Sequence, residues 1–176
     1  MTIDSLFAKA QQIKLVIFDI DGVLTDGTLF YTDTETQFKA FHVHDGVGIK
    51  LLEKAEIHVA VITSHDTPVV ARRTQALGIR HVYQGQRDKL PAYEELKNKL
   101  NLPDEAICYV GDDLPDLPLI RRAGLGITVA NGANFVKQHA DWTTTQKGGT
   151  GAVREICELI LTAQNKLDAL QNDYLR

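Results

Sequence analysis

The sequence predicts an α/β protein: a Rossmann-like, mostly parallel sheet with helices on both faces. Short runs of strand-favouring apolar residues alternate with segments of helical periodicity along almost the whole chain. Four of these runs lead into polar or charged residues, and no repeat or low-complexity segment interrupts the alternation. With 176 residues, the chain suits a single domain, 1–176, that can bury a proper core.

The composition excludes several classes of protein. A net charge of −4 with dispersed lysines and arginines argues against a nucleic-acid partner. No apolar run approaches the length of a membrane span, and the first twelve residues, which include Asp4 and Lys9, do not resemble a signal peptide. Cys108 and Cys157 lie in apolar segments outside any metal-binding pattern, which fits a cytoplasmic protein.

The first predicted strand, Leu15–Phe18, delivers two carboxylates to one edge of the sheet. Asp19 and Asp21 follow this strand directly, and Gly22 comes next. Two carboxylates a few ångströms apart raise one another's pKa and disfavour double ionisation. A cation is therefore expected beside them, and a metal ion is the simplest candidate.

A β-hairpin is predicted after this strand, at about residues 28–42. Strands at 29–31 and 37–41 flank a polar turn at 32–36. The hairpin carries four aromatic residues, more than a solvated two-stranded ribbon should expose. We therefore expect it to pack against another surface.

The rest of the chain alternates helices and strands. We expect helices from Asp45-Gly46 to Ala55, from Thr67-Pro68 to the residue before Gly78, from about Lys89 to Leu100, after Leu114, and after the segment 148–151. Strands are expected at 57–63, 81–83, 107–110, 125–130 and, shorter, 141–144. The polar tail after Leu167, at about 168–176, is expected to fray.

Polar and charged residues follow four of these strands. In parallel sheets, ligands gather beyond the carboxyl ends of the strands, so these side chains are expected in one crevice. Carboxylates would hold a hard cation such as Mg²⁺, while hydroxyl, lysine and backbone N–H groups would hold phosphate oxygens. The residues concerned are Asp19, Asp21, Thr63, Ser64, Lys89, Asp112 and Asp113.

Asp19-Ile20-Asp21-Gly22-Val23 with the following Leu-Thr-Asp-Gly, then Thr63, Lys89 and Gly111-Asp112-Asp113 in that order, resemble the four motifs of the haloacid dehalogenase superfamily of phosphohydrolases. The chain has no room for a cap domain. The hairpin, the segment 41–46, Gln84-Gly85-Gln86 and the late Gly-Gly-x-Gly-Ala-Val-Arg-Glu resemble one family within it, the 3-deoxy-D-manno-octulosonate 8-phosphate (KDO 8-phosphate) phosphatases. That family makes a precursor of bacterial lipopolysaccharide.

The resemblance implies a role for each acidic residue of the two main motifs. Asp19 would be the nucleophile that forms an aspartyl-phosphate, and Asp21 the general acid that later activates water. Mg²⁺ would be held by Asp19, Asp112 and the backbone carbonyl of Asp21. Asp113 and Asp116 would orient the metal or Lys89, or simply cap the following helix.

The resemblance also implies a phosphate- and substrate-binding set. Lys89 and Thr63, with backbone N–H groups near Gly22, would hold the phosphoryl oxygens. Ser64 and His65 would contact the sugar. Asp45, where the chain re-enters the core, would either reach the crevice or cap a helix.

Two positions depart from the family pattern. The residues after Thr63 are usually Gly-Arg and here are Ser64-His65; the variable residue of the Gly-Gly-x-Gly segment is usually basic and here is Thr150. Both expected cations would help bind the carboxylate of a sugar acid. The phosphatases of nine-carbon, sialic acid-type sugar phosphates are therefore the close alternative.

The resemblance implies a homotetramer in which each hairpin roofs a neighbouring subunit's site. A receiver-type signalling domain, which also uses acidic residues, a threonine and a lysine, is the alternative from another class. Its motif order differs, because receivers place the acidic pair first and Thr/Ser and Lys last. Here Thr63 and Lys89 precede the second acidic pair.

Overall fold

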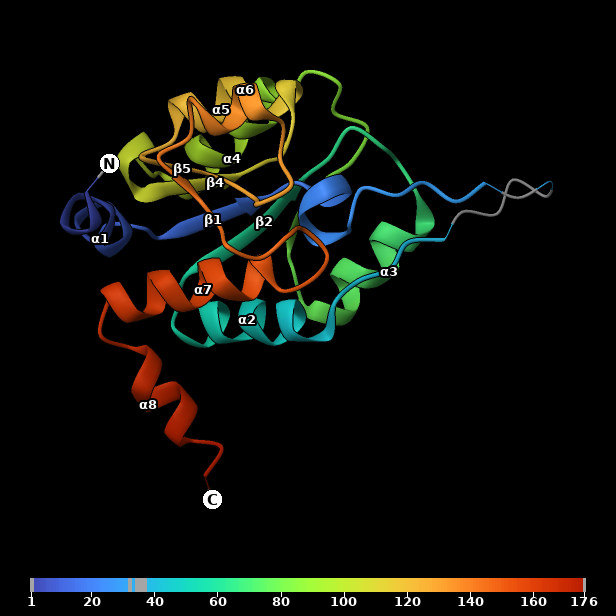
Figure 1. Ribbon diagram of the computed structural model, residues 1–176. Coiled ribbons are helices and arrows are strands. Elements are labelled where there is room, and N and C mark those ends of the chain that lie inside the picture. Colours follow the sequence, from blue (N-terminus) through green and yellow to red (C-terminus); the bar gives the residue numbers. More distant parts are fainter. Residues whose placement is uncertain (1, 32, 34–37, 176) are drawn as a thin grey trace.

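The computed structural model describes residues 2–31, 33 and 38–175. Its centre is a six-stranded parallel sheet in the order β3-β2-β1-β4-β5-β6 (Figure 1). The strands are β1 (Leu15–Phe18), β2 (His58–Ile62), β3 (His81–Tyr83), β4 (Ile107–Val110), β5 (Leu125–Thr128) and β6 (Trp142–Thr143). The predicted α/β class and parallel sheet are confirmed.

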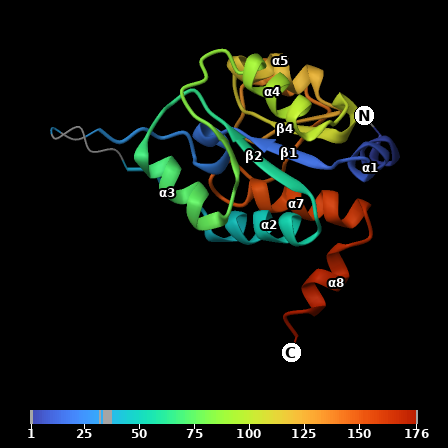
Figure 2. The ribbon, with the colours of Figure 1, turned by 180° about the vertical axis from the view of Figure 1, so that it is seen from behind.

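Helices cover both faces of this sheet (Figures 1 and 2). On one face lie α2 (Val43–Lys54), α3 (Pro68–Leu77) and α7 (Ala152–Ala163), with α1 (Ile3–Gln11) at the edge of the same layer. On the other lie α4 (Leu90–Leu100), α5 (Leu117–Arg122) and α6 (Asn134–Lys137). None of the helices in the described ranges is both long and apolar enough to cross a membrane.

β1 lies between β2 and β4, and all four of its residues are fully buried. A strand covered on both faces has to be apolar throughout, as Leu15–Phe18 is. Phe18 pairs with Val61 of β2 and Val110 of β4, so Asp19 emerges level with the ends of both neighbours. The sheet order reverses direction between β1 and β4, which is where ligands bind in open α/β sheets.

The predicted element boundaries hold to within a few residues. β3 and β4 have the predicted limits, and Gly78 ends α3 in the left-handed conformation (φ 86°) that glycine adopts without strain. α2 begins at Val43, two residues before the predicted start at Asp45. An acidic residue stabilises a helix from within its first turn as well as from the cap, so Asp45 marks this start only approximately.

The predicted hairpin is described only in part. Phe30 and Phe38 form one antiparallel bridge, and the described chain that leads to Phe30 runs outward from the carboxyl end of the sheet (Figures 1 and 2). Most of the predicted turn, 32 and 34–36, and Gln37 lie outside the described residues. Among the described residues, Phe30, Tyr31 and Phe38 are 52%, 79% and 58% exposed, whereas Phe41, the fourth aromatic residue of the predicted hairpin, packs against the core.

The C-terminal tail differs from its prediction. Residues expected to fray form a further helix, α8 (Leu167–Asn172), which leaves the end of α7 (Figure 1). Leu167 and Leu170 pack against the core beneath α7, and Lys54 forms an ion pair with Asp173. These tertiary contacts order a segment whose own composition is too polar to predict a helix.

Candidate active site

The loop after β1 is closed by Thr25. Residues Ile20–Leu24 form a wide turn in which Asp21 and Gly22 have non-helical backbone angles, and the Thr25 N–H donates to the Ile20 carbonyl at 3.0 Å. The Thr25 hydroxyl accepts from the backbone N–H groups of Gly22 and Gly27, each at 3.3 Å. The Gly22 N–H, which the sequence assigned to phosphate, is therefore already engaged. The sequence predicted no role for Thr25, although its position three residues after Gly22 was the signal that could have identified it.

Gly22 is required because Asp112 fills the space where a side chain would be. A methyl group at this position would overlap the Asp112 carboxylate, and the φ of Gly22 is 92°, which side chains rarely adopt. The close approach of the two loops thus brings the Asp112 carboxylate against the turn that follows Asp19. From the sequence, a glycine at position 22 is expected instead to let the backbone approach phosphate.

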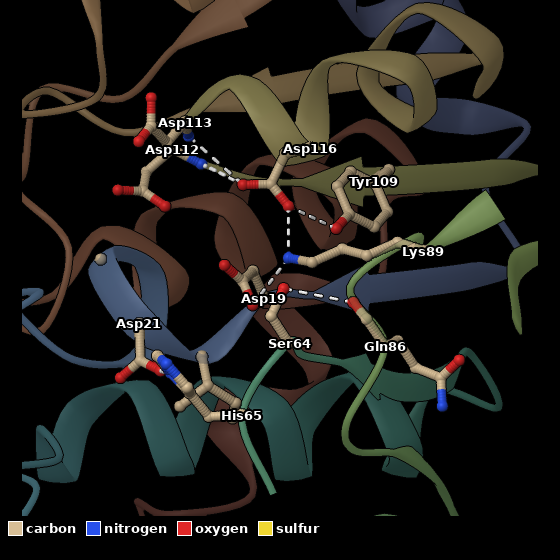
Figure 3. A network of polar contacts seen from close by, with 12 residues as sticks. Asp19, Asp21, Ser64, His65, Gln86, Lys89, Tyr109, Asp112, Asp113 and Asp116 are labelled. Atoms are coloured by element: carbon tan, nitrogen blue, oxygen red, sulfur yellow. Dashed lines mark hydrogen bonds and ion pairs between the residues drawn. The ribbon is translucent and has the colours of Figure 1, made fainter.

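Three carboxylates converge at the point where the sheet order reverses. One oxygen each from Asp19, Asp112 and Asp116 lies within 4.8 Å of the others. Asp19 follows β1, and the other two follow β4 (Figure 3). The metal prediction for Asp21 concerned its backbone carbonyl; its carboxylate lies outside this group, as described below.

Lys89 lies between two of these carboxylates (Figure 3). Its Nζ is 3.0 Å from Asp19 Oδ1 and 2.6 Å from Asp116 Oδ1, and its side chain is 2% exposed. Burial disfavours the ammonium charge, but Asp19 and Asp116 outweigh this effect and raise the pKa of Lys89. The lysine therefore stays charged inside the site.

Asp116 orients its neighbours. Its Oδ1 accepts from Lys89 Nζ and from the buried hydroxyl of Tyr109, both at 2.6 Å, and its Oδ2 accepts from the N–H groups of Asp112 (3.0 Å) and Asp113 (3.3 Å). Both oxygens are thus committed to the protein. The Asp113 carboxylate accepts from the Leu114 N–H at 2.8 Å and caps the following turn, which is the structural alternative foreseen for it.

The arrangement disfavours the ionised form of the Asp19 and Asp112 side chains. Burial, and then the Asp116 carboxylate, raise the pKa of both residues to about 7. A cation bound beside the Asp116 carboxylate would stabilise the ionised forms of Asp19 and Asp112, whose pKa values are raised. Carboxylate oxygens are the ligands that Mg²⁺ prefers. The residues present therefore fit a magnesium ion.

The Asp21 carboxylate is held from both sides and points away from this cluster (Figure 3). Lys39 Nζ forms an ion pair with its Oδ1, and His65 Nδ1 lies 2.8 Å from its Oδ2. Burial alone would raise the pKa of Asp21, but the contacts with His65 and Lys39 lower it. Sequence reasoning missed Lys39, because nothing local distinguishes this lysine from any other polar residue within the predicted hairpin strand 37–41.

Thr63 and Ser64 stand at the end of β2, beside β1. Thr63 is 1% exposed and its backbone is fixed by Tyr83 and Gln86, whose N–H donates to the Thr63 carbonyl at 3.0 Å. The Ser64 hydroxyl donates to the Gln86 carbonyl at 3.2 Å (Figure 3). Ser64 thus ties two loops together, and its contact with a substrate stays a prediction.

Asp45 is not part of this constellation. Its side chain is fully buried between α2 and the start of α7, and its Oδ1 accepts from the Arg154 N–H at 2.9 Å. It therefore caps a helix, the second of its two predicted roles, but the helix is α7 and not its own. Burial raises the pKa of Asp45, and the hydrogen bond from Arg154 opposes that rise.

Two glycines of the segment 148–151 pack on the turn that follows β1. A methyl group on Gly148 would overlap the Gly22 carbonyl, while the Gly149 N–H donates to the Val23 carbonyl at 2.9 Å. The segment was predicted as the approach to a helix and, at its variable position Thr150, as a place where the family binds the carboxylate of its substrate. It also supports the turn that carries Asp21.

Replacing Gly148 with alanine is expected to lower kcat/KM by about 10²-fold, because displacing the turn by an ångström misplaces Asp21. The overlap should also lower the free energy of unfolding by about 1–3 kcal/mol. Steady-state kinetics and thermal unfolding check both effects. Lys147→Met, an exposed change directly before this segment, is the control; equal losses in the two variants would contradict this packing role.

The metal-free protein is expected to lose stability between about pH 4 and pH 7. In this window Asp19 and Asp112 ionise in the unfolded chain while their folded pKa of about 7 keeps them protonated, so unfolding is favoured as pH rises. Mg²⁺ binds the ionised form, so saturating Mg²⁺ should raise Tm strongly at about pH 8 and little at about pH 5. An equal rise at both pH values, measured by scanning calorimetry, would rule out these two ligands.

Comparison with known proteins gives one consistent family. A family model described as haloacid dehalogenase-like hydrolase matches residues 52–156. The 3-deoxy-D-manno-octulosonate 8-phosphate phosphatase KdsC of Escherichia coli K12 is 45% identical over 163 residues, which are 93% of this chain and 87% of that protein. The KdsC protein of Yersinia pestis is 44% identical over 94% of this chain and 88% of its own length.

Solved structures agree with these relatives. A probable YrbI family phosphatase from Pseudomonas syringae matches with a TM-score of 0.97 and 47% identity over 98% of each chain. The 3-deoxy-D-manno-octulosonate 8-phosphate phosphatase from Moraxella catarrhalis, in complex with a magnesium ion, a phosphate ion and KDO, matches with a TM-score of 0.96 and 45% identity. The match covers 98% of this chain and 99% of that one.

Proposed function

Because the chain belongs to the haloacid dehalogenase-like hydrolases, we propose that it is a Mg²⁺-dependent phosphatase that converts KDO 8-phosphate to KDO and inorganic phosphate. The observation that carries the proposal is the juxtaposition of the Asp19, Asp112 and Lys89 side chains at the reversal of the sheet order. The receiver-type alternative is set aside by the family match. We place the protein in the cytoplasm, in the synthesis of a lipopolysaccharide precursor.

Asp19 is the nucleophile in this proposal. One of its carboxylate oxygens attacks phosphorus, so that an Asp19–phosphorus bond forms as the bond to the sugar oxygen breaks. Asp21 gives its proton to the departing sugar oxygen. The Asp21 pKa is lowered in the free site, and a phosphate dianion bound beside it raises that pKa by like-charge repulsion, so substrate binding favours the protonated acid.

The second step returns the residues to their starting state. Asp21, now ionised, takes a proton from a water molecule while that water attacks phosphorus. The Asp19–phosphorus bond breaks, phosphate is released and the Asp19 carboxylate is restored. Dividing the displacement into two steps matters because monoester hydrolysis is among the slowest uncatalysed reactions, accelerated by up to about 10²¹-fold.

Asp19, Asp112 and the backbone carbonyl of Asp21 would hold Mg²⁺. Asp116 is assigned an orienting role, because both its oxygens are already bonded to the protein. When bound, the ion neutralises charge on the phosphoryl oxygens. Lys89 adds a fixed positive charge beside Asp19, and Thr63 adds a hydroxyl at the end of β2.

The substrate is tested by comparing eight-carbon and nine-carbon sugar-acid phosphates. We expect a higher kcat/KM for KDO 8-phosphate, in line with the named relatives that are 44–45% identical. Ser64, His65 and Thr150, where the chain departs from the family pattern, keep the nine-carbon, sialic acid-type substrate as the alternative. A preference for the nine-carbon ester, or for an unrelated phosphate, would overturn the substrate assignment and leave the chemistry intact.

We further propose that the protein is a homotetramer assembled through the segment 28–42. The support is the exposure of Phe30, Tyr31 and Phe38 on the part of this segment that is described, which is unfavourable for an isolated chain. Deleting the tip of the segment should shift the sedimentation coefficient towards that of the monomer. An unchanged tetramer after this deletion would refute the interface.

A further inference from the structure

We propose that Lys39 and His65 are positioning residues that clamp the Asp21 carboxylate for proton transfer to the leaving sugar oxygen. The inference rests on the proposed function and goes beyond it, since neither residue has been given this role. It also differs from the earlier expectation that His65 contacts the sugar in place of the family's basic residue. The geometry around Asp21 carries it.

The clamp has one buried and one exposed arm. The Lys39 side chain is only 3% exposed, although Phe38 before it is 58% exposed. A buried ammonium group needs a partner, and the Asp21 carboxylate is the acidic group that Lys39 contacts. The His65 side chain is 57% exposed, and its Nδ1 lies 2.8 Å from Oδ2, the other carboxylate oxygen of Asp21. Lys39 therefore sets the position of the carboxylate, and His65 blocks its rotation.

Both arms come from segments outside the Asp21 loop. Lys39 directly follows the bridge between Phe30 and Phe38, so the return of the predicted hairpin determines where it lies. His65 lies on the loop after β2, which is fixed to the loop after β3 through the hydrogen bond from Ser64 to the Gln86 carbonyl. Two independently anchored groups thus hold one carboxylate, which is how a proton donor is kept in a productive geometry.

The same geometry places both groups at the phosphate end of the substrate. Asp21 has to touch the ester oxygen to protonate it, and Lys39 and His65 are in direct contact with Asp21. In KDO 8-phosphate the carboxylate and the phosphate are at opposite ends of the sugar. A residue hydrogen-bonded to the general acid is therefore badly placed to bind the sugar's carboxylate.

The clamp is tested by the leaving-group dependence of the phosphorylation step, measured alone by rapid quench. An alkyl phosphate needs protonation of its poor leaving group, whereas the phenolate of p-nitrophenyl phosphate leaves with little help from an acid. Lys39→Met should slow phosphorylation by an alkyl phosphate about 10–100-fold and that by p-nitrophenyl phosphate less than about 3-fold. Lys39→Arg, which keeps the cation, should recover most of the loss.

Two control measurements accompany this test of the clamp, and two outcomes would contradict the proposal. Lys50→Met, on the exposed face of α2, should change neither rate, and thermal unfolding establishes that Lys39→Met is folded. His65→Asn keeps a donor near Asp21 and should retain more activity on the alkyl ester than His65→Ala. Equal losses of phosphorylation rate on both esters would show that Lys39 has only a structural role and would overturn the proposal.

The other contradicting result is a rise in KM confined to esters that carry a carboxylate, with the rate on glycerol 3-phosphate unchanged. That result would make Lys39 and His65 a receptor for the sugar acid. The test is separate from the substrate assignment, because it runs on any alkyl phosphate that the protein hydrolyses. If KDO 8-phosphate is not the preferred ester, the comparison with p-nitrophenyl phosphate still decides the role of the clamp.

Discussion

Replacing Asp19 with asparagine is expected to abolish Mg²⁺-dependent phosphatase activity, with a loss of about 10⁴-fold or more in kcat. The amide has nearly the same shape as the carboxylate but is a very poor nucleophile. It also removes one of the proposed ligands of the metal. Turnover of a generic phosphate ester, measured with and without Mg²⁺, gives the loss.

The fold should survive this change and become more stable without metal. Burial raises the pKa of Asp19 to about 7, so the ionised side chain destabilises the metal-free protein above that pH. Asp19→Asn removes that cost, and its Tm at about pH 8 should equal or exceed that of the unaltered protein. Asp26→Asn, on an exposed residue of the same motif, should leave activity unchanged. Retained turnover in Asp19→Asn would contradict the assignment of Asp19 as the nucleophile.

Replacing Lys89 with methionine should harm both activity and stability. The side chain is 2% exposed, and its loss leaves Asp19 and Asp116 as buried carboxylates without their cationic partner. Removing one member of a buried ion pair typically costs about 3–5 kcal/mol. Because Lys89 also supplies charge beside the reacting phosphate, kcat should fall by about 10²–10³-fold.

Mg²⁺ separates the two effects. A bound ion supplies positive charge to the Asp19 side of the cluster, so saturating Mg²⁺ should recover part of the lost Tm in Lys89→Met but little of the activity. Lys99→Met, at an exposed position near the end of α4, is the matched control and should behave as the unaltered protein does. Full activity in folded Lys89→Met would exclude the lysine from phosphate binding.

The parts of the fold and site that depend on strand order could be predicted from the sequence. β1 and β4 were identified from short buried runs, because a strand covered on both faces leaves a continuous apolar signal. Once those strands are parallel neighbours, residues at their carboxyl ends have to meet. The meeting of Asp19, Asp112 and Lys89 therefore followed from sequence position.

Features that depend on contacts between distant loops could not be predicted in this way. Lys39 reaches Asp21 only because the chain folds back after residue 38, and Asp45 caps α7, a helix more than a hundred residues further along. Gly148 is explained by the close approach of the Gly22 carbonyl, and Gly22 by the close approach of Asp112 together with its own positive φ. α8 is ordered by contacts with α7 and Lys54 that its polar sequence does not reveal.

The central claim is that phosphate is transferred to Asp19. Rapid quenching during turnover of KDO 8-phosphate, followed by borohydride reduction, converts a phosphorylated aspartate to homoserine, and peptide mass spectrometry locates it. We predict homoserine at position 19 and at no other aspartate, dependent on both substrate and Mg²⁺. Homoserine at another aspartate, or none at position 19 while phosphate is being released, would contradict the account.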